Sequence, residues 1–173
     1  MNIKDHIGSI PGFPKEGIIF RDVTPILECP EAFEEVTKQL SQFARDVQAD
    51  VIIGPEARGF FFGIPVANEL KLPFVPVRKP GKLPRKTISE TYELEYGTDT
   101  LCMHADSLKP ENRVVIIDDL LATGGTVEAI VKLVEKQQAK VAGIGFVIEL
   151  DDLKGKSKFE GIPVCSLVHF EGE

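Results

Sequence analysis

Two adjacent acids and a turn of small residues lie in the middle of the chain, within the stretch VVIIDDLLATGGT at residues 114–126. Residues 114–117 form a continuous β-branched apolar run, which is typical of a strand buried on both faces. Asp118 and Asp119 follow where such a strand would leave the sheet. Beyond the turn, apolar residues recur at helical spacing, so the sequence predicts a helix that opens within or just after the turn. The turn itself is made of Ala122, Thr123, Gly124, Gly125 and Thr126.

This order of parts suits the binding of a sugar phosphate. Glycines let a backbone approach an anion closely, and free N–H groups at a helix start point toward it. Thr123 and Thr126 add hydroxyl donors. The two carboxylates would repel a phosphate, so their natural partners are sugar hydroxyls or a metal ion carried by the ligand. The stretch therefore predicts a site for a ribose 5-phosphate, although Gly-Gly is often only a turn and acids often only favour a helix N-terminus.

As a whole, IIDDLLATGGT resembles the phosphoribosyl diphosphate (PRPP) signature of the type I phosphoribosyltransferases. The resemblance implies that residues 122–126 bind the 5-phosphate and that Asp118 and Asp119 bind the ribose hydroxyls.

An arginine follows the first predicted strand, at residues 51–54, in the sequence PEARG. Arg58 thus lies between the carboxyl end of a strand and the start of an apolar helix that runs to about Leu70. A guanidinium there can bind an anion with two hydrogen bonds, or it can form a structural pair with Glu56. The family's Arg-Gly motif implies a role for Arg58 on pyrophosphate.

A basic segment at residues 78–86, with five Lys or Arg residues and no acid, follows a predicted strand at 74–78. Such a run is usually a solvated loop, but it can also be a mobile lid over an anion. Two strands around a turn at Gly97 and Thr98 come next, with Glu93, Glu95 and Tyr96 on the first and the sequence LEYG leading into the turn. Residues 78–101 resemble the family's lid and catalytic hairpin, which implies that Lys79 and Lys82 bind pyrophosphate, and that Glu95 and Tyr96 lie near the reacting base as catalytic residues with Arg58 and Lys82.

The first 29 residues are rich in proline and glycine and predict an irregular flap. The segment GFPKEGIIFRDVTPIL resembles the base-binding hood of the adenine-using members of the family. There the backbone near Ile19, Phe20 and Arg21 is expected to meet the edge of adenine. Without the resemblance, a simple arm packed on the core is the better interpretation.

The remaining elements predict one α/β domain over residues 1–173. A helix at 30–48 and strands at 51–54, 74–78, 114–118, 141–149 and 164–168 give a parallel five-stranded core sheet flanked by helices. Pro76 places the second strand at an edge, and the strand order is then 2-1-3-4-5. Ligands are expected at the carboxyl ends of the first and third strands, where that order reverses.

Composition narrows the class of protein. A formal net charge of −7 argues against nucleic acid as the main partner. We expect no signal peptide and no membrane span, and the three scattered cysteines suit a reducing cytoplasm. Gly155-Lys156-Ser157 lacks the first glycine of a P-loop, and the three histidines show no metal-ligand spacing, so no metal ligands are assigned to the chain.

The resemblance implies the reaction adenine + PRPP → AMP + pyrophosphate, with Mg²⁺ bound mainly through PRPP, in a cytoplasmic homodimer. Two alternatives are a family enzyme for another base, such as xanthine, and a regulator that only senses PRPP. A regulator would normally carry an added DNA-binding element or a degraded lid, and this sequence shows neither.

Overall fold

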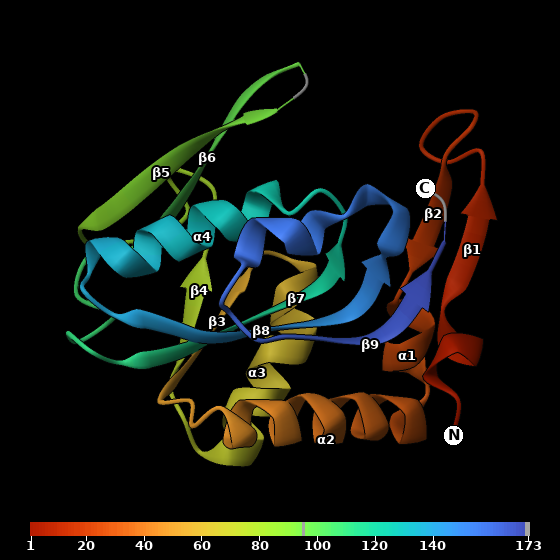
Figure 1. The fold of residues 1–173 in the computed structure, drawn as a ribbon, viewed down its shortest axis with the longest axis horizontal. Coiled ribbons are helices and arrows are strands. Elements are labelled where there is room, and N and C mark those ends of the chain that lie inside the picture. The colour runs from red at the N-terminus through yellow and green to blue at the C-terminus, as the bar shows by residue number, and fades with distance from the viewer. Residues whose placement is uncertain (95, 172–173) are drawn as a thin grey trace.

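The computed structural model describes residues 1–94 and 96–171, and its centre is a five-stranded parallel sheet (Figure 1). The order β4-β3-β7-β8-β9 is the predicted 2-1-3-4-5. Pro76 does lie in an edge strand, where it removes no hydrogen bond from the centre of the sheet. The strands are β3 (Val51–Pro55), β4 (Phe74–Val77), β7 (Arg113–Leu121), β8 (Lys140–Leu150) and β9 (Val164–Phe170).

The third core strand is longer than the sequence suggested. β7 does not end before the two acids; it continues through them to Leu121, where it still pairs with Glu149 of β8. The reason is its neighbour, since β8 is buried from Val141 to Leu150 and offers a ladder along the whole length. Asp118 and Asp119 are therefore held by a strand rather than by a loop.

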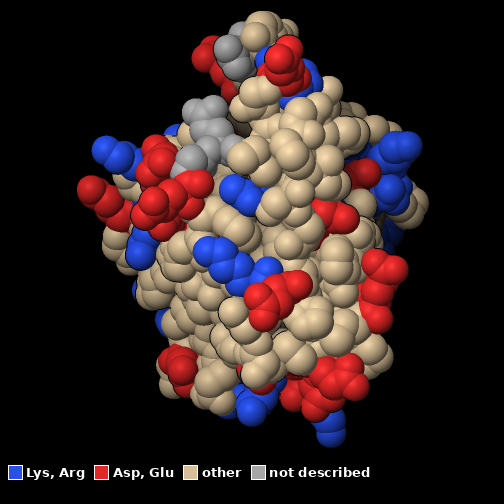
Figure 2. Space-filling view, turned by 90° about the vertical axis from the view of Figure 1, so that its right-hand side faces the viewer, with Lys and Arg blue, Asp and Glu red and all other residues tan. Residues whose placement is uncertain are grey.

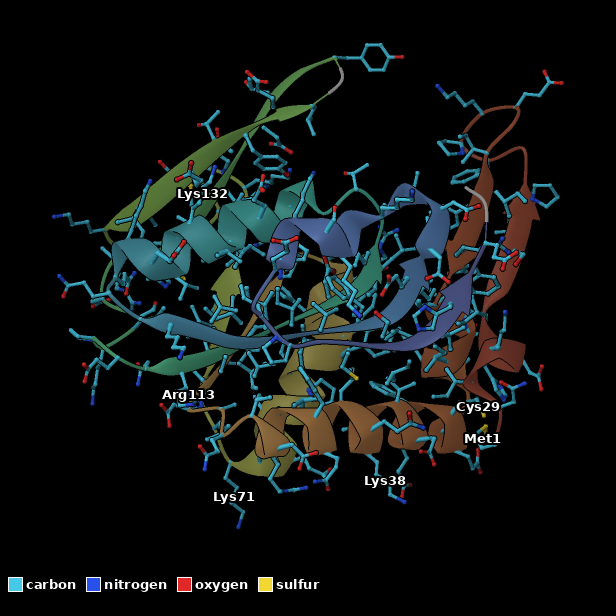
Figure 3. The ribbon with its side chains drawn as sticks, viewed as in Figure 1. Met1, Cys29, Lys38, Lys71, Arg113 and Lys132 are labelled. Carbon is cyan, nitrogen blue, oxygen red and sulfur yellow. The ribbon has the colours of Figure 1, made fainter. Side chains whose placement is uncertain are left out.

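Helices cover both faces of the sheet (Figure 1). On one face α2 (Pro30–Asp46) and α3 (Arg58–Leu70) pack against Val115 and Ile117, while α4 (Gly125–Lys136) packs on the other face against Val114 and Ile116. This alternation is what a strand buried on both faces requires. Lys38 projects from the outer face of α2, away from the sheet (Figure 3).

The N-terminal hood contains more regular structure than the predicted flap. Strands β1 (Gly8–Pro11) and β2 (Ile19–Asp22) form an antiparallel pair, in which Ile10 lies opposite Phe20. The short helix α1 (Thr24–Glu28) connects this pair to α2, and the 3-10 helix η1 (Ile3–His6) precedes the pair and packs against α2. In Figure 1 the hood lies at the right, next to the carboxyl ends of β8 and β9.

A second hairpin, β5 (Thr87–Leu94) and β6 (Gly97–His104), confirms the two strands predicted after the basic segment. Its turn comes earlier than predicted, because Leu94 already pairs with Gly97. Tyr96 therefore lies in the turn and not on the first strand. The hairpin packs over α4 and extends away from the sheet (Figure 1).

Between β8 and β9 the predicted polar turn consists of two short 3-10 helices, η2 (Asp151–Leu153) and η3 (Gly155–Phe159). Phe159 is buried in the core beneath α4, which fixes this connection to the body of the protein. Among the described residues, no helix is long and apolar enough to cross a membrane.

Candidate active site

An open cavity of about 500 Å³ lies at the carboxyl ends of β3 and β7, where the strand order reverses. Its lining comes from both of the motifs that the sequence singled out. The lining residues are Pro55, Glu56, Arg58, residues 92–94, residues 118–127 and Lys158. The prediction that PEARG and the acid-rich turn meet in one crevice is confirmed.

The turn at residues 122–126 ends directly in a helix. Gly124 is the N-terminal capping residue of α4, with a φ of 89° that an L side chain adopts only under strain. At Gly125 an added Cβ would meet only Tyr92 Cδ2, at 3.8 Å, so this position is open toward the cavity. The first N–H groups of α4 have no partner within the helix. This geometry fits an anion such as a phosphate.

The two acids of β7 differ in their surroundings. Asp119 is 4% exposed, and its Oδ2 lies 2.8 Å from Nε of Arg58. Its backbone N–H donates to Oδ1 of Asp118 over 2.8 Å. Burial raises the pKa of Asp118 well above its ordinary value, the negative charge of Asp119 raises it further, and Arg58 offsets part of this effect. Asp118 is therefore costly to keep charged in this environment.

Arg58 does not form the structural pair with Glu56 that was the alternative interpretation. Glu56 instead accepts hydrogen bonds from Nε of Arg78, at 3.0 Å, and from the backbone N–H of Lys79, at 2.9 Å. Half of the Arg58 side chain is exposed, and its guanidinium lies 5.7 Å from the Phe20 ring centroid. Arg58 is thus bound to Asp119 but accessible from the cavity.

The basic segment contacts both the edge of the cavity, where Arg78 and Lys79 donate to Glu56, and the second hairpin. Lys79 pairs with Asp99 of β6, and Lys82 is exposed and does not line the cavity. Tyr92 of β5 connects the two regions, because its hydroxyl lies 3.5 Å from both Asp99 Oδ2 and Thr126 Oγ1. Tyr96 is 86% exposed, and the predicted catalytic Glu95 lies outside the described residues.

Ile19, Phe20 and Arg21 lie on β2 and do not line the cavity either. Arg21 donates to Oγ of Ser9 over 2.6 Å, and its guanidinium lies 4.1 Å from the centre of the Phe170 ring. These contacts join the hood to the end of β9. The binding of a base by residues 19–21 stays a prediction.

Comparison with known proteins decides the family. The model of the phosphoribosyl transferase domain matches residues 22–163. The chain belongs to the phosphoribosyltransferase family. It is 52% identical to a curated adenine phosphoribosyltransferase of Streptococcus thermophilus over 172 residues, which cover 99% of this chain and 100% of that protein.

Solved structures agree along the whole chain. Adenine phosphoribosyltransferase from Thermoanaerobacter pseudethanolicus matches with a TM-score of 0.93 and 50% identity, covering 97% of this chain and 98% of the other. The enzyme from Saccharomyces cerevisiae, solved with an imino-altritol bisphosphate and adenine, matches with a TM-score of 0.89 and 41% identity. That match covers 95% of this chain and 96% of the yeast chain.

Within this phosphoribosyltransferase chain, the structure adds lining residues to which the sequence assigned no role. Tyr92 and Glu93 line the cavity from β5, together with Leu94 of LEYG, and Lys158 lines it from η3. The sequence pattern of residues 155–157 excludes a P-loop and predicts no other role for them, and the one signal that this segment contacts the turn at residues 122–126 is Gly155 itself. A Cβ on Gly155 would lie 2.3 Å from the carbonyl oxygen of Ala122, so only glycine fits.

His169 is an exposed histidine with specific partners. Its Nδ1 lies 2.7 Å from Oδ1 of Asp151, and Glu149 is close enough that the three side chains could together hold a metal ion. Glu149 already accepts a hydrogen bond from Ser166 over 2.6 Å. These bonds join the ends of β8 and β9.

Proposed function

We propose that this protein transfers the 5-phosphoribosyl group of PRPP to adenine, giving AMP and pyrophosphate. One observation carries the proposal. A single cavity is lined by residues 122–126 at the start of α4, called the phosphate turn from here on, by the two acids of β7 and by Arg58. Full-length similarity to proteins named adenine phosphoribosyltransferase supports the same reaction.

The reaction needs positioning and charge stabilisation more than a protein nucleophile. The bond from C1 of the ribose to pyrophosphate breaks, C1 becomes cation-like, and a ring nitrogen of adenine forms the new bond. Residues 122–126 hold the 5-phosphate at the start of α4, while Asp118 and Asp119 accept hydrogen bonds from the ribose hydroxyls. Fixing both ends of the sugar phosphate aligns C1 with the base, and a dry site strengthens each charge interaction.

Arg58 has two uses in this scheme. In the free protein it neutralises Asp119, whose carboxylate is buried at the cavity wall. When PRPP binds, the ribose hydroxyls replace Arg58 at Asp119, and the guanidinium turns to the pyrophosphate. Lys79 and Lys82 complete the pyrophosphate site when the basic segment closes over it. Binding of the sugar and of the pyrophosphate are thereby coupled.

Mg²⁺ would be held mainly by PRPP rather than by the protein. Two carboxylates of the described lining, Glu56 and Glu93, have no role at the ribose in this scheme, and oxygen ligands are those that Mg²⁺ prefers. When bound, the ion neutralises charge on the leaving pyrophosphate. Asp118 and Asp119 remain ligands of the ribose.

The hood provides the base site. Ile19 and Arg21 offer backbone N–H and C=O groups to the edge of adenine, and Phe20 covers its face. Glu95, with Tyr96 beside it, assists the movement of the proton that adenine loses. The protein acts in the cytoplasm as a homodimer, and exposed apolar side chains such as Ile64, 47% exposed, are candidates for the subunit interface.

Pyrophosphate release measured with PRPP, Mg²⁺ and each purine base in turn tests this function. A site built on specific hydrogen bonds can reject a mismatched base by roughly 10⁴–10⁵ in kcat/KM. We expect AMP from adenine, and far slower turnover of hypoxanthine, guanine and xanthine. Comparable turnover of hypoxanthine would refute the choice of adenine. PRPP binding without turnover of any base would indicate a PRPP sensor instead.

A further inference from the structure

The 3-10 helix η3 packs against the phosphate turn, residues 122–126. Gly155 is buried with no room for a Cβ beside Ala122, and Phe159 is buried in the core. Between these two anchors, Lys158 passes close to the helix start, since a Cβ on Gly124 would lie 3.4 Å from Lys158 Cδ. The ammonium group, one methylene beyond Cδ, therefore ends near the phosphate turn.

Acidic side chains outnumber basic ones in the described lining of the cavity, so an anionic ligand requires a positive charge there. The charged lining residues in the described part of the chain are four acids, Glu56, Glu93, Asp118 and Asp119, against the two cations Arg58 and Lys158. Arg58 is already paired with Asp119. Lys158 is exposed and makes no ion pair with the described acids. Among the described lining residues, Lys158 is therefore the cation without an acidic partner, and a phosphate entering the cavity would meet its positive charge.

We propose that Lys158 is a further binding residue for the 5-phosphate, and that η3 forms a second wall of the phosphate site opposite the turn. This proposal rests on the proposed function, because it assigns a contact to the same substrate. The lysine adds a charge-assisted bond to the backbone N–H donors of α4. Since the 5-phosphate is remote from C1, the bond holds the substrate and the transition state equally.

The test compares Lys158→Met with Lys156→Met by calorimetry. Lys156 is exposed on the same 3-10 helix but does not line the cavity, so both variants remove one charge from one surface segment. The probes are ribose 5-phosphate, AMP, PRPP with Mg²⁺, and adenine. We expect Lys158→Met to weaken ribose 5-phosphate and AMP about tenfold, as for loss of one partly exposed charge-assisted bond. Adenine affinity and the melting temperature stay unchanged.

Kinetics and salt separate a bond to phosphate from a structural role. In Lys158→Met, KM for PRPP rises while kcat changes little, and the affinity for ribose 5-phosphate depends less on salt. Lys158→Arg keeps the charge and restores most of the affinity.

Several results would overturn the proposal. The first is equal affinity for ribose 5-phosphate in the two methionine variants. The second is a lower melting temperature of Lys158→Met together with weaker binding of all four probes, which would indicate a structural role. Failure of the proposed function gives a different result, namely no AMP from wild-type protein with adenine and PRPP. In that case ribose 5-phosphate binding still decides the role of Lys158.

Discussion

The phosphate end of the cavity and its base and pyrophosphate ends are built in different ways. Residues 118–126 join the buried strand β7 to α4, which packs on the core, and every one of these residues lines the cavity. Ile19, Lys79 and Lys82 belong to segments outside the five-stranded sheet and do not line the cavity, although the backbone N–H of Lys79 donates to the lining residue Glu56. The residues expected to bind the phosphate are thus gathered at one cavity, and most of those expected to bind the base and the pyrophosphate are not among its lining.

The difference follows from what each segment is packed against. The phosphate turn has β7 before it, α4 after it and Gly155 of η3 against its carbonyl oxygen. The hood is a two-stranded pair with Ile10 and Phe13 43% and 50% exposed. Two-stranded pairs are marginal alone, so the hood can shift at lower cost than the turn. We infer that PRPP docks first by its 5-phosphate, and that the hood and the basic segment close later.

Gly155→Ala should disturb the phosphate turn and have the largest effect on stability and on phosphate binding. Its Cβ would lie 2.3 Å from the carbonyl oxygen of Ala122 and 2.9 Å from Leu121 Cδ1, so the turn or η3 must move. Overpacking of this kind costs about 1–3 kcal/mol. We expect a lower melting temperature together with loss of ribose 5-phosphate binding in calorimetry. Unchanged binding would show that the turn does not depend on η3.

Gly125→Ala sharpens the comparison without disturbing the fold. The new methyl group has space in the free protein but occupies the side from which the phosphate approaches. The melting temperature should stay constant, and the affinities for AMP and PRPP should fall by roughly 10- to 100-fold, as expected when a charged hydrogen bond is lost. Adenine affinity is the internal control. If adenine weakens equally, close phosphate approach is not the reason for this glycine.

Asp118→Asn separates stability from function, with a smaller effect on binding. Asn keeps the Oδ1 acceptor for the backbone N–H of Asp119 but removes a buried charge beside another acid. We expect PRPP affinity about tenfold weaker, with a higher melting temperature at neutral pH. A stabilised variant with unchanged PRPP affinity would remove Asp118 from the ribose site.

The pH dependence has a defined sign. Folding raises the pKa of Asp118 above its ordinary value of 3.8, so the folded protein binds this proton more tightly than the unfolded chain. Wild-type stability is therefore lost as pH rises from about 4 through the raised pKa, whereas Asn at position 118 does not titrate. The melting temperature advantage of the variant should grow over that interval and disappear below it. A constant advantage at all pH values would contradict the assigned cause.

The fold and the phosphate end were predictable from the sequence because their signals are local and consistent. Apolar runs predicted the core strands, and Pro76 predicted which strand lies at the edge of the sheet. The small residues before Val127 predicted the turn and the start of the helix. In such segments burial, turn chemistry and helix capping all favour the same structure.

Features that depend on partners distant in sequence were missed or wrong. β7 continues past Asp118 because β8 offers a long ladder, and Arg58 pairs with Asp119 instead of its near neighbour Glu56 because α3 packs on β7. Lys158 reaches the cavity only through the fit of Gly155 against the phosphate turn. Residue spacing along the chain contains none of these contacts.

Hydrogen exchange of the free and bound protein tests most directly whether the phosphate end of the cavity is formed before binding and whether the base and pyrophosphate ends form on binding. The exchange of backbone amides is compared without ligand, with ribose 5-phosphate, and with PRPP, Mg²⁺ and 9-deazaadenine, a non-transferable base analogue. We predict that residues 114–136 are already protected in the free protein and change little. Residues 8–22 and 78–86 should gain protection only when PRPP and the base analogue are both present. Equal protection of all three regions in the free protein, or a gain over residues 114–136 as large as that in the hood, would contradict the account.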